Sequence, residues 1–72
     1  MILFQKNVDG YDVKVKTTEM YDSGEITDDD DEVAADITVE GNGHSIKAPI
    51  WAPLPKEITE VMVKRFLRAE GL

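Results

Sequence analysis

The pair Asn42-Gly43 and the apolar residues on either side of it constrain the fold of this chain more than any other feature. Both residues tolerate the positive φ angles that the two central positions of a type I′ turn require. A two-residue turn here sets four apolar pairs opposite one another, which are Val39 with Ile46, Ile37 with Ala48, Ala35 with Ile50, and Val33 with Ala52. A three-residue turn would pair Val39 with Ser45 and lose all four pairs. We therefore predict a hairpin with one apolar face.

The other face of this hairpin is expected to be polar. It would carry Asp36, Thr38, Glu40, Ser45 and Lys47, with Ala34 beside Trp51. Because Pro49 has no N–H to donate to a ladder, the second strand of the hairpin is expected at an edge of the sheet.

A second hairpin is predicted around Asp9-Gly10, which also suits a type I′ turn. A two-residue turn collects most of the large apolar side chains on one face, and its pairs are Val8 with Tyr11, Lys6 with Val13, Phe4 with Val15, and Ile2 with Thr17. Lys6 is the one misfit on that face. The second strand is expected to extend as far as Met20 and Tyr21.

A helix is predicted from near Glu57 to about Ala69. Pro55 suits its first turn and Gly71 its C-terminal stop. The stripe expected to face the sheet consists of Ile58, Val61, Met62, Phe66 and Ala69, at three- and four-residue spacing. Glutamates early in the helix and Lys64, Arg65 and Arg68 late in it complement the helix dipole.

These elements predict a single α+β domain over residues 1–72, with an antiparallel sheet of about four strands and one C-terminal helix packed on a face. The two hairpins are joined by residues of about 22–32, where clustered like charges and poor strand propensity predict a mobile acidic loop. A chain of 72 residues has room for one such domain.

Composition excludes several classes of protein. The chain has no cysteine and only one histidine, so neither a disulfide nor a zinc site is expected. Its net charge of −7 disfavours binding to nucleic acid and to anionic membranes, so partners should be basic, or neutral and apolar. No apolar run is long enough to span a membrane, and the N-terminus lacks the features of a signal peptide. We expect a soluble protein of the cytoplasm, or of the host cytoplasm if a phage encodes it.

The negative charge is concentrated in the middle of the chain, where no basic residue lies between Lys16 and Lys47. A calcium loop is not expected at Asp28–Glu32, because the sixth position counted from Asp28 is Val33 where glycine is needed, and the twelfth is Val39 where glutamate is needed. Two interpretations stay open, a solvated loop and an anionic surface for a partner, which could mimic nucleic-acid phosphates. The candidate partner-binding residues are Asp22, Glu25, Asp28, Asp29, Asp30, Asp31, Glu32 and Asp36.

No residue set indicates catalysis. His44 lies beside the predicted turn, and no serine has an evident base and orienting carboxylate. Gly41-Asn42-Gly43 is a turn without the strand-to-helix junction of a phosphate-binding loop. We predict a protein that is not an enzyme and holds no cofactor.

Trp51, Val63 and Leu67 are the apolar residues that the predicted core leaves over. In one interpretation Pro53-Leu54-Pro55 covers Trp51 and the helix stripe is wide. In the other, the three residues form an exposed apolar patch for a partner or for self-association.

Ile37–Glu40, His44–Ala52 and the helix opening near Glu57 together resemble the small early proteins with which certain coliphages inhibit bacterial RNA polymerase. The likeness covers about a third of the chain. In that family a further strand after the helix carries functional arginines, whereas Arg65 and Arg68 lie on the helix here, so no functional residue is carried over. The resemblance implies a small phage or mobile-element protein that disables a host macromolecule of transcription or defence.

The main hypothesis is therefore a protein-binding inhibitor or regulator whose acidic surface meets a basic host protein. The alternative is a structural or assembly subunit, or a homodimer, that makes contact through Trp51, Val63 and Leu67. Salt weakens the electrostatic contact and not the apolar one, so ionic strength distinguishes the two hypotheses.

Overall fold

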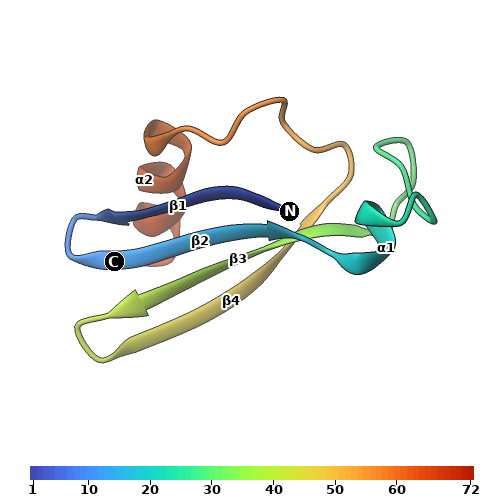
Figure 1. Ribbon diagram of the computed structural model, residues 1–72. Coiled ribbons are helices and arrows are strands. Elements are labelled where there is room, and N and C mark those ends of the chain that lie inside the picture. Colours follow the sequence, from blue (N-terminus) through green and yellow to red (C-terminus); the bar gives the residue numbers. More distant parts are fainter.

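A computed structural model describes residues 1–72 and shows one four-stranded antiparallel sheet with two helices (Figure 1). Strands β1 (Ile2–Val8), β2 (Tyr11–Thr17), β3 (Val33–Gly41) and β4 (His44–Trp51) lie side by side in chain order. Helix α1 (Glu19–Asp22) follows β2, and helix α2 (Glu60–Ala69) follows β4. The predicted α+β class is confirmed, including the two hairpins, the C-terminal helix and the edge position of β4 that Pro49 indicated.

Both hairpins turn where the sequence predicts. Asp9 and Gly10 have φ angles of 54° and 89°, and Asn42 and Gly43 have φ angles of 49° and 79°. These are the positive angles of type I′ turns, whose twist matches that of the strands they join. The three predicted pairs nearest each turn are confirmed. In the first hairpin they are Val8–Tyr11, Lys6–Val13 and Phe4–Val15, and in the second they are Val39–Ile46, Ile37–Ala48 and Ala35–Ile50.

The outermost pair of each hairpin was predicted wrongly. Ile2 lies opposite Lys16 and not Thr17, and Val33 lies opposite Trp51 and not Ala52. In each case the register shifts within two residues, between Ile2 and Phe4 and between Val33 and Ala35. A bulge inserts one extra residue into a strand, and strict alternation of apolar residues does not reveal it.

The predicted extension of the second strand through Met20 and Tyr21 is also wrong. Strand β2 ends at Thr17, and both residues belong to α1. Thr18 caps this short helix, because its side-chain oxygen accepts a hydrogen bond from the Tyr21 N–H at 3.4 Å.

Helix α2 packs on one face of the sheet and completes a single hydrophobic core. The fully buried residues of this cluster are Val8, Val13, Val15, Ala35, Ile37, Val39, Val63 and Leu67. The helix begins at Glu60, three residues later than predicted, because Thr59 caps it by accepting from the Met62 N–H at 3.3 Å. Pro55 therefore lies before the helix and not in its first turn.

The buried side of α2 is centred on residues that the predicted stripe omitted. Val63 and Leu67 are 1% and 3% exposed, whereas Val61, a member of the predicted stripe, is 59% exposed. Ala69 is also exposed, and only Ile58, Met62 and Phe66 of that stripe are half-buried. Apolar residues occupy most of the circumference of this helix, so periodicity alone is consistent with burial of either of two neighbouring faces. Contact with the sheet selected the one that contains Val63 and Leu67.

The face of the sheet away from α2, called the open face below, is polar and exposed. Its exposed charged residues on β2, β3 and β4 are Asp12, Lys14, Lys16, Glu40 and Lys47, and its half-buried polar residues on β3 are Asp36 and Thr38. An antiparallel sheet commonly keeps one face in water in this way. Neither helix is long and apolar enough to cross a membrane.

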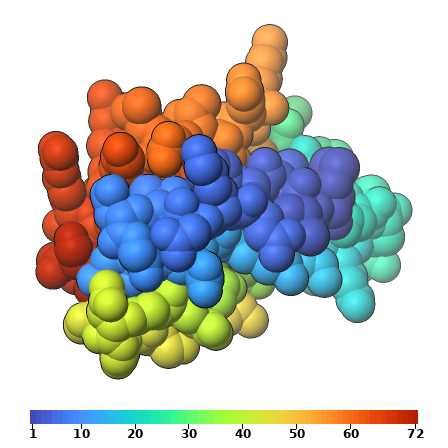
Figure 2. All heavy atoms as spheres, turned by 60° about the vertical axis from the view of Figure 1, so that its left-hand side comes forward, coloured from blue at the N-terminus to red at the C-terminus, as the bar shows by residue number.

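The molecule is elongated, with extents of 36 × 18 × 17 Å. Helix α2 and the two hairpin turns lie at one end, and α1 and the segment that follows it lie at the other (Figure 1). Figure 2 agrees, since the segment after α1 lies on the side of the molecule away from α2. The acidic part of the sequence is thus separated from the helix that carries Lys64, Arg65 and Arg68.

Gly41 brings the two hairpins close together, which leads to a prediction. Its φ is 150°, and a Cβ atom there would lie 2.8 Å from the carbonyl oxygen of Gly10. Gly41→Ala is expected to destabilise the domain by about 2 kcal/mol, because the backbones must move apart. Gly24→Ala is the control, since Gly24 has a φ of 81° but no neighbour within 4 Å. Urea unfolding of both variants tests this, and equal losses of stability would contradict it.

Candidate functional site

The acidic end, defined as residues 19–32, is the most distinctive surface of the molecule. It contains Glu19, Asp22, Glu25, Asp28, Asp29, Asp30, Asp31 and Glu32. All of these side chains are exposed except that of Asp30, which is half-buried. The structure brings together the predicted site residues from Asp22 to Glu32. Asp36 lies apart from them on the open face, paired across the sheet with Lys16 and Pro49.

One apolar side chain anchors this segment. Ile26 is 4% exposed, and Ala34, the extra residue of the β3 bulge, is fully buried, although neither belongs to the core cluster beneath α2. The N–H groups of Glu25 and Ile26 donate to the carbonyl of Met20 at 3.0 and 3.3 Å. Ile26 and the turn after α1 therefore attach the acidic end to the sheet.

Thr18 attaches α1 directly to β3. Its N–H donates to the carbonyl of Ala34 at 3.0 Å, and its hydroxyl donates to the carbonyl of Val33 at 3.1 Å. Together with the cap on Tyr21, these bonds fix where the chain leaves β2. The acidic end is thereby held at a set angle to the sheet.

Two further hydrogen bonds shape the run of aspartates. The Tyr21 hydroxyl donates to Asp28 Oδ1 at 2.9 Å, and the Thr27 N–H donates to Asp30 Oδ2 at 2.8 Å. The bond to Asp28 raises the pKa of Tyr21, because the carboxylate stabilises the protonated phenol. Asp29 and Asp31 make no side-chain hydrogen bond or ion pair within the chain, so they are free to meet a partner. The predicted mobility of this loop stays a prediction.

Asp22 differs from its neighbours because it is held by the start of the chain. The amino group of Met1 lies 2.8 Å from Asp22 Oδ2, and the Thr17 hydroxyl donates to Asp22 Oδ1. The buried Thr17 also fixes Met1, since its N–H donates to the Met1 carbonyl at 2.8 Å. The bond from the amino group, followed by that from Thr17, lowers the pKa of Asp22, and the loss of some water around the carboxylate opposes this shift.

A pH-dependent contribution to stability follows from Asp22. A carboxyl with a lowered pKa in the folded state stabilises that state fully above its ordinary pKa of 3.8, and the contribution disappears as the pH falls through the lowered value. Asp22→Asn is therefore expected to reduce the loss of stability between neutral pH and the region below 3.8. Urea unfolding at both pH values measures this. Glu19→Gln, which removes a carboxylate of α1 that makes no ion pair or side-chain hydrogen bond, is the matched control, and an equal reduction in that variant would contradict the role of Asp22.

The structure groups no set of side chains suited to binding a metal ion. No three or more histidine, cysteine, aspartate or glutamate side chains are placed so that they could hold a metal ion. His44 stacks at a tilt against Tyr11, with ring centroids 6.2 Å apart. This contact gives the histidine a packing role beside the hairpin turns.

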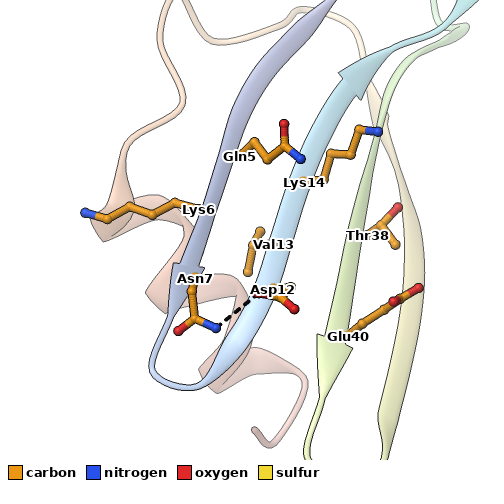
Figure 3. Close-up of a pocket in the computed structure, with 8 residues that line it drawn as sticks. All are labelled: Gln5, Lys6, Asn7, Asp12, Val13, Lys14, Thr38 and Glu40. Carbon is orange, nitrogen blue, oxygen red and sulfur yellow. Dashed lines mark hydrogen bonds between the residues drawn. The ribbon is translucent and has the colours of Figure 1, made fainter.

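The largest hollow in the surface lies on the open face (Figure 3). It is shallow, has a volume of about 530 Å³, and mixes positive and negative side chains. Lys14 of β2 and Thr38 and Glu40 of β3 line one part of it, and the Asn7 side chain donates to Asp12 at 3.1 Å near the hairpin turn (Figure 3). Lys6 and Lys14 lie among Asp12 and Glu40 here, so neighbouring opposite charges partly offset one another.

The apolar patch predicted from Trp51, Val63 and Leu67 is wrong for two of its three residues. Val63 and Leu67 lie in the core, so only Trp51 stays on the surface, at 55% exposure. The alternative interpretation was that the apolar stripe of the helix is wide and that Pro53-Leu54-Pro55 covers Trp51. The wide stripe is confirmed, because Val63 and Leu67 are buried, but Trp51 stays exposed. Sequence reasoning also missed Ile26 and the Thr17–Asp22 contact. An isolated isoleucine within an acidic stretch was the available signal for the first.

Comparison of the chain with protein-family models, with curated proteins and with solved structures finds no match. Its function is therefore argued from the geometry and chemistry of its own residues.

Proposed function

We propose that this protein is a non-enzymatic binding module that docks its acidic end on a basic surface of another protein, as an inhibitor or regulator. The observation that supports this most directly is the concentration of eight carboxylates within residues 19–32, at one end of an elongated molecule. Lys16 and Lys47, the nearest basic residues in sequence, lie on the strands of the sheet and not within the acidic end.

Electrostatics explains why such a surface selects a basic partner. Only Asp22 is neutralised locally, by the Met1 amino group, so the other carboxylates add their fields beyond the surface. A concentrated field of this kind steers an oppositely charged surface and raises the association rate. Nucleic acid has the same sign and is not a partner. A protein surface that holds nucleic acid has the opposite sign and is a suitable target for an acidic mimic.

The internal contacts of the acidic end favour binding over simple solvation. A segment that serves only solubility needs no defined shape, whereas Ile26, Tyr21 and Thr27 give this one a buried anchor and two hydrogen-bonded aspartates. Such preorganisation lowers the entropy cost of association, because less of the segment must be ordered on binding. The target class suggested by the phage resemblance, a host protein of transcription or defence, is part of this proposal.

Charge reversal tests the proposal and gives a third prediction. Asp29→Lys, Asp30→Lys and Asp31→Lys together change the net charge from −7 to −1. The matched control reverses Asp12, Glu40 and Glu57, which are exposed, lie outside the acidic end and give the same net charge. We expect the first triple variant to bind the target about 100-fold more weakly, because attraction becomes repulsion at the contact. The control should lose far less affinity.

The experiment is an affinity pull-down from bacterial lysate at low and high salt, with the native chain and both triple variants as baits. A host protein retained by the native and control baits, lost at high salt and lost from the acidic-end variant, supports the proposal and identifies the target. Affinity is then measured with the purified target. Equal retention by all three baits, or no retained host protein, would show that the acidic end serves solubility.

A further inference from the structure

The sheet has two free edges, because β1 and β4 are its outermost strands. In an antiparallel hairpin closed by a two-residue turn, every second residue directs its backbone N–H and C=O away from the partner strand. Counted from the turns, the residues that face outwards in this way are Ser45, Lys47 and Pro49 on β4, and Gln5 and Asn7 on β1. The two edges therefore offer different backbone groups to a neighbouring strand.

The edge of β4 is closed to another strand. Pro49 falls on an outward-facing position, so its missing N–H costs no bond to β3 but removes a donor from the free edge. Lys47 occupies the outward-facing position before it and is exposed. Proline and lysine on an edge strand oppose pairing with another strand.

The edge of β1 has no such interruption. Its register is regular from Phe4 to Val8, and this stretch contains no proline. Gln5 and Asn7 are exposed, and none of the backbone hydrogen bonds outside the strands and helices involves them. An edge strand with free donors and acceptors is a template for pairing with another chain, so some other feature must prevent this pairing.

Lys6 lies in the middle of this open edge and is the one charged residue on the apolar side of β1. Figure 3 shows its side chain extending away from β2, past the edge of the sheet. Its Nζ lies 3.7 Å from Glu60 Oε1, and the two side chains are 59% and 44% exposed. A surface ion pair of this kind contributes little to stability. The pair therefore does not explain a lysine at a position opposite the buried Val13, where an apolar residue would extend the core.

Pairing of β1 with β1 of a second copy would bring Lys6 against itself. In an antiparallel pair on a two-fold axis, Gln5 of each copy bonds to Asn7 of the other, because these residues have the free backbone groups. The two Lys6 side chains then face each other with Cβ atoms about 4.5–5.5 Å apart, where like charges are destabilising. An axis through Gln5 or through Asn7 avoids this contact, but it brings the bulge or the turn of β1 into the pair and leaves a single regular bonded position.

We propose that Lys6 prevents this chain from pairing with a second copy of itself along β1, so that the sheet ends at both edges. A charged residue that points inwards on an edge strand is known to act in this way. The inference does not rest on the proposed function, since neither Lys6 nor its neighbours on β1 belong to the acidic end. Its consequence is that a monomer presents the acidic end.

Lys6→Val tests the proposal, and Lys14→Val is the matched control. Both substitutions change the net charge from −7 to −8, but Lys14 is an exposed residue of β2, which lies inside the sheet. In sedimentation velocity up to millimolar concentration, the native chain and Lys14→Val should stay monomeric. Lys6→Val should form a dimer, with an association constant at least about ten-fold above the limit for the native chain. A monomeric Lys6→Val, or a dimer of the native chain or of Lys14→Val, would overturn the proposal.

Hydrogen exchange locates the contact in the Lys6→Val dimer. The amides of Gln5 and Asn7 should exchange fast in the native chain and at least about ten-fold more slowly in the dimer, because pairing along β1 protects them. Fast exchange of these amides in the dimer would place the contact elsewhere and contradict the proposal.

A second substitution copies the closed edge of β4 onto β1. Adding Gln5→Pro to Lys6→Val removes an outward-facing N–H without removing a bond to β2, so the double variant should return to a monomer. A dimer that persists in the folded double variant, or an assembly of Lys6→Val larger than a dimer, would contradict pairing along β1. Amide circular dichroism checks that each variant is folded, and if the double variant is not, the exchange of the Gln5 and Asn7 amides decides.

Discussion

Leu67→Ala is expected to destabilise the domain by about 3 kcal/mol, because it leaves a cavity beneath α2 that the sheet cannot fill. Leu67 is buried in the core cluster, where α2 packs on the sheet. A domain of this size has a net stability of only about 3–5 kcal/mol. The variant should therefore be largely unfolded at room temperature, and urea titration followed by circular dichroism measures the loss.

Val61→Ala is the control for this prediction. Val61 is exposed on the same helix, although the apolar periodicity of the sequence placed it on the buried stripe. Its truncation should change the free energy of unfolding by no more than about 0.5 kcal/mol. A larger loss for Val61→Ala than for Leu67→Ala would mean that α2 is rotated on the sheet and presents the face that periodicity favoured.

Ile26→Ala has the second large effect, and this effect is expected to be local. Removing most of a buried isoleucine side chain costs about 2–4 kcal/mol. Because Ile26 lies outside the core cluster beneath α2, the loss should fall on α1 and the acidic end and leave the sheet folded. Hydrogen exchange should show faster exchange of the Glu25 and Ile26 amides, which donate to Met20, with little change in β2 and β3.

Met20→Ala is the matched control, since Met20 also lies in this segment but is 46% exposed, against 4% for Ile26. It should leave the exchange of these amides nearly unchanged. Equal exchange in Ile26→Ala and the native chain would show that Ile26 does not anchor the segment. If the acidic end binds a basic partner in its folded shape, Ile26→Ala should also weaken that binding without altering a single charge. Simple solvation by the carboxylates predicts no such effect.

Salt distinguishes the two hypotheses drawn from the sequence. Binding through the acidic end depends on opposite charges, so it weakens as ionic strength rises. A contact made through an apolar side chain such as Trp51 does not depend on opposite charges, so it should persist at high salt. A salt titration of any retained partner therefore separates an electrostatic contact from an apolar one.

The parts of the fold that the sequence determined are those set by neighbouring residues. Asp9-Gly10 and Asn42-Gly43 specify their turns, because few residue pairs accept two consecutive positive φ angles. Each turn then fixes the register of the pairs next to it, since a slip of one residue would turn every apolar side chain towards water. The concentration of carboxylates between Lys16 and Lys47 was also plain from the sequence.

The remaining features were decided by contacts between residues far apart in the chain. One bulge lies in β1 between Ile2 and Phe4, near the N-terminus, and the other lies in β3 between Val33 and Ala35, near α1. The local pattern of apolar residues predicts neither of them. Helix α2 has apolar residues on two adjoining faces, and only the sheet selected Val63 and Leu67. The same holds for Asp22, whose pKa depends on the amino group of Met1, 21 residues away. Local sterics select turns and pairs, whereas burial and charge pairing depend on which distant groups the completed fold brings together.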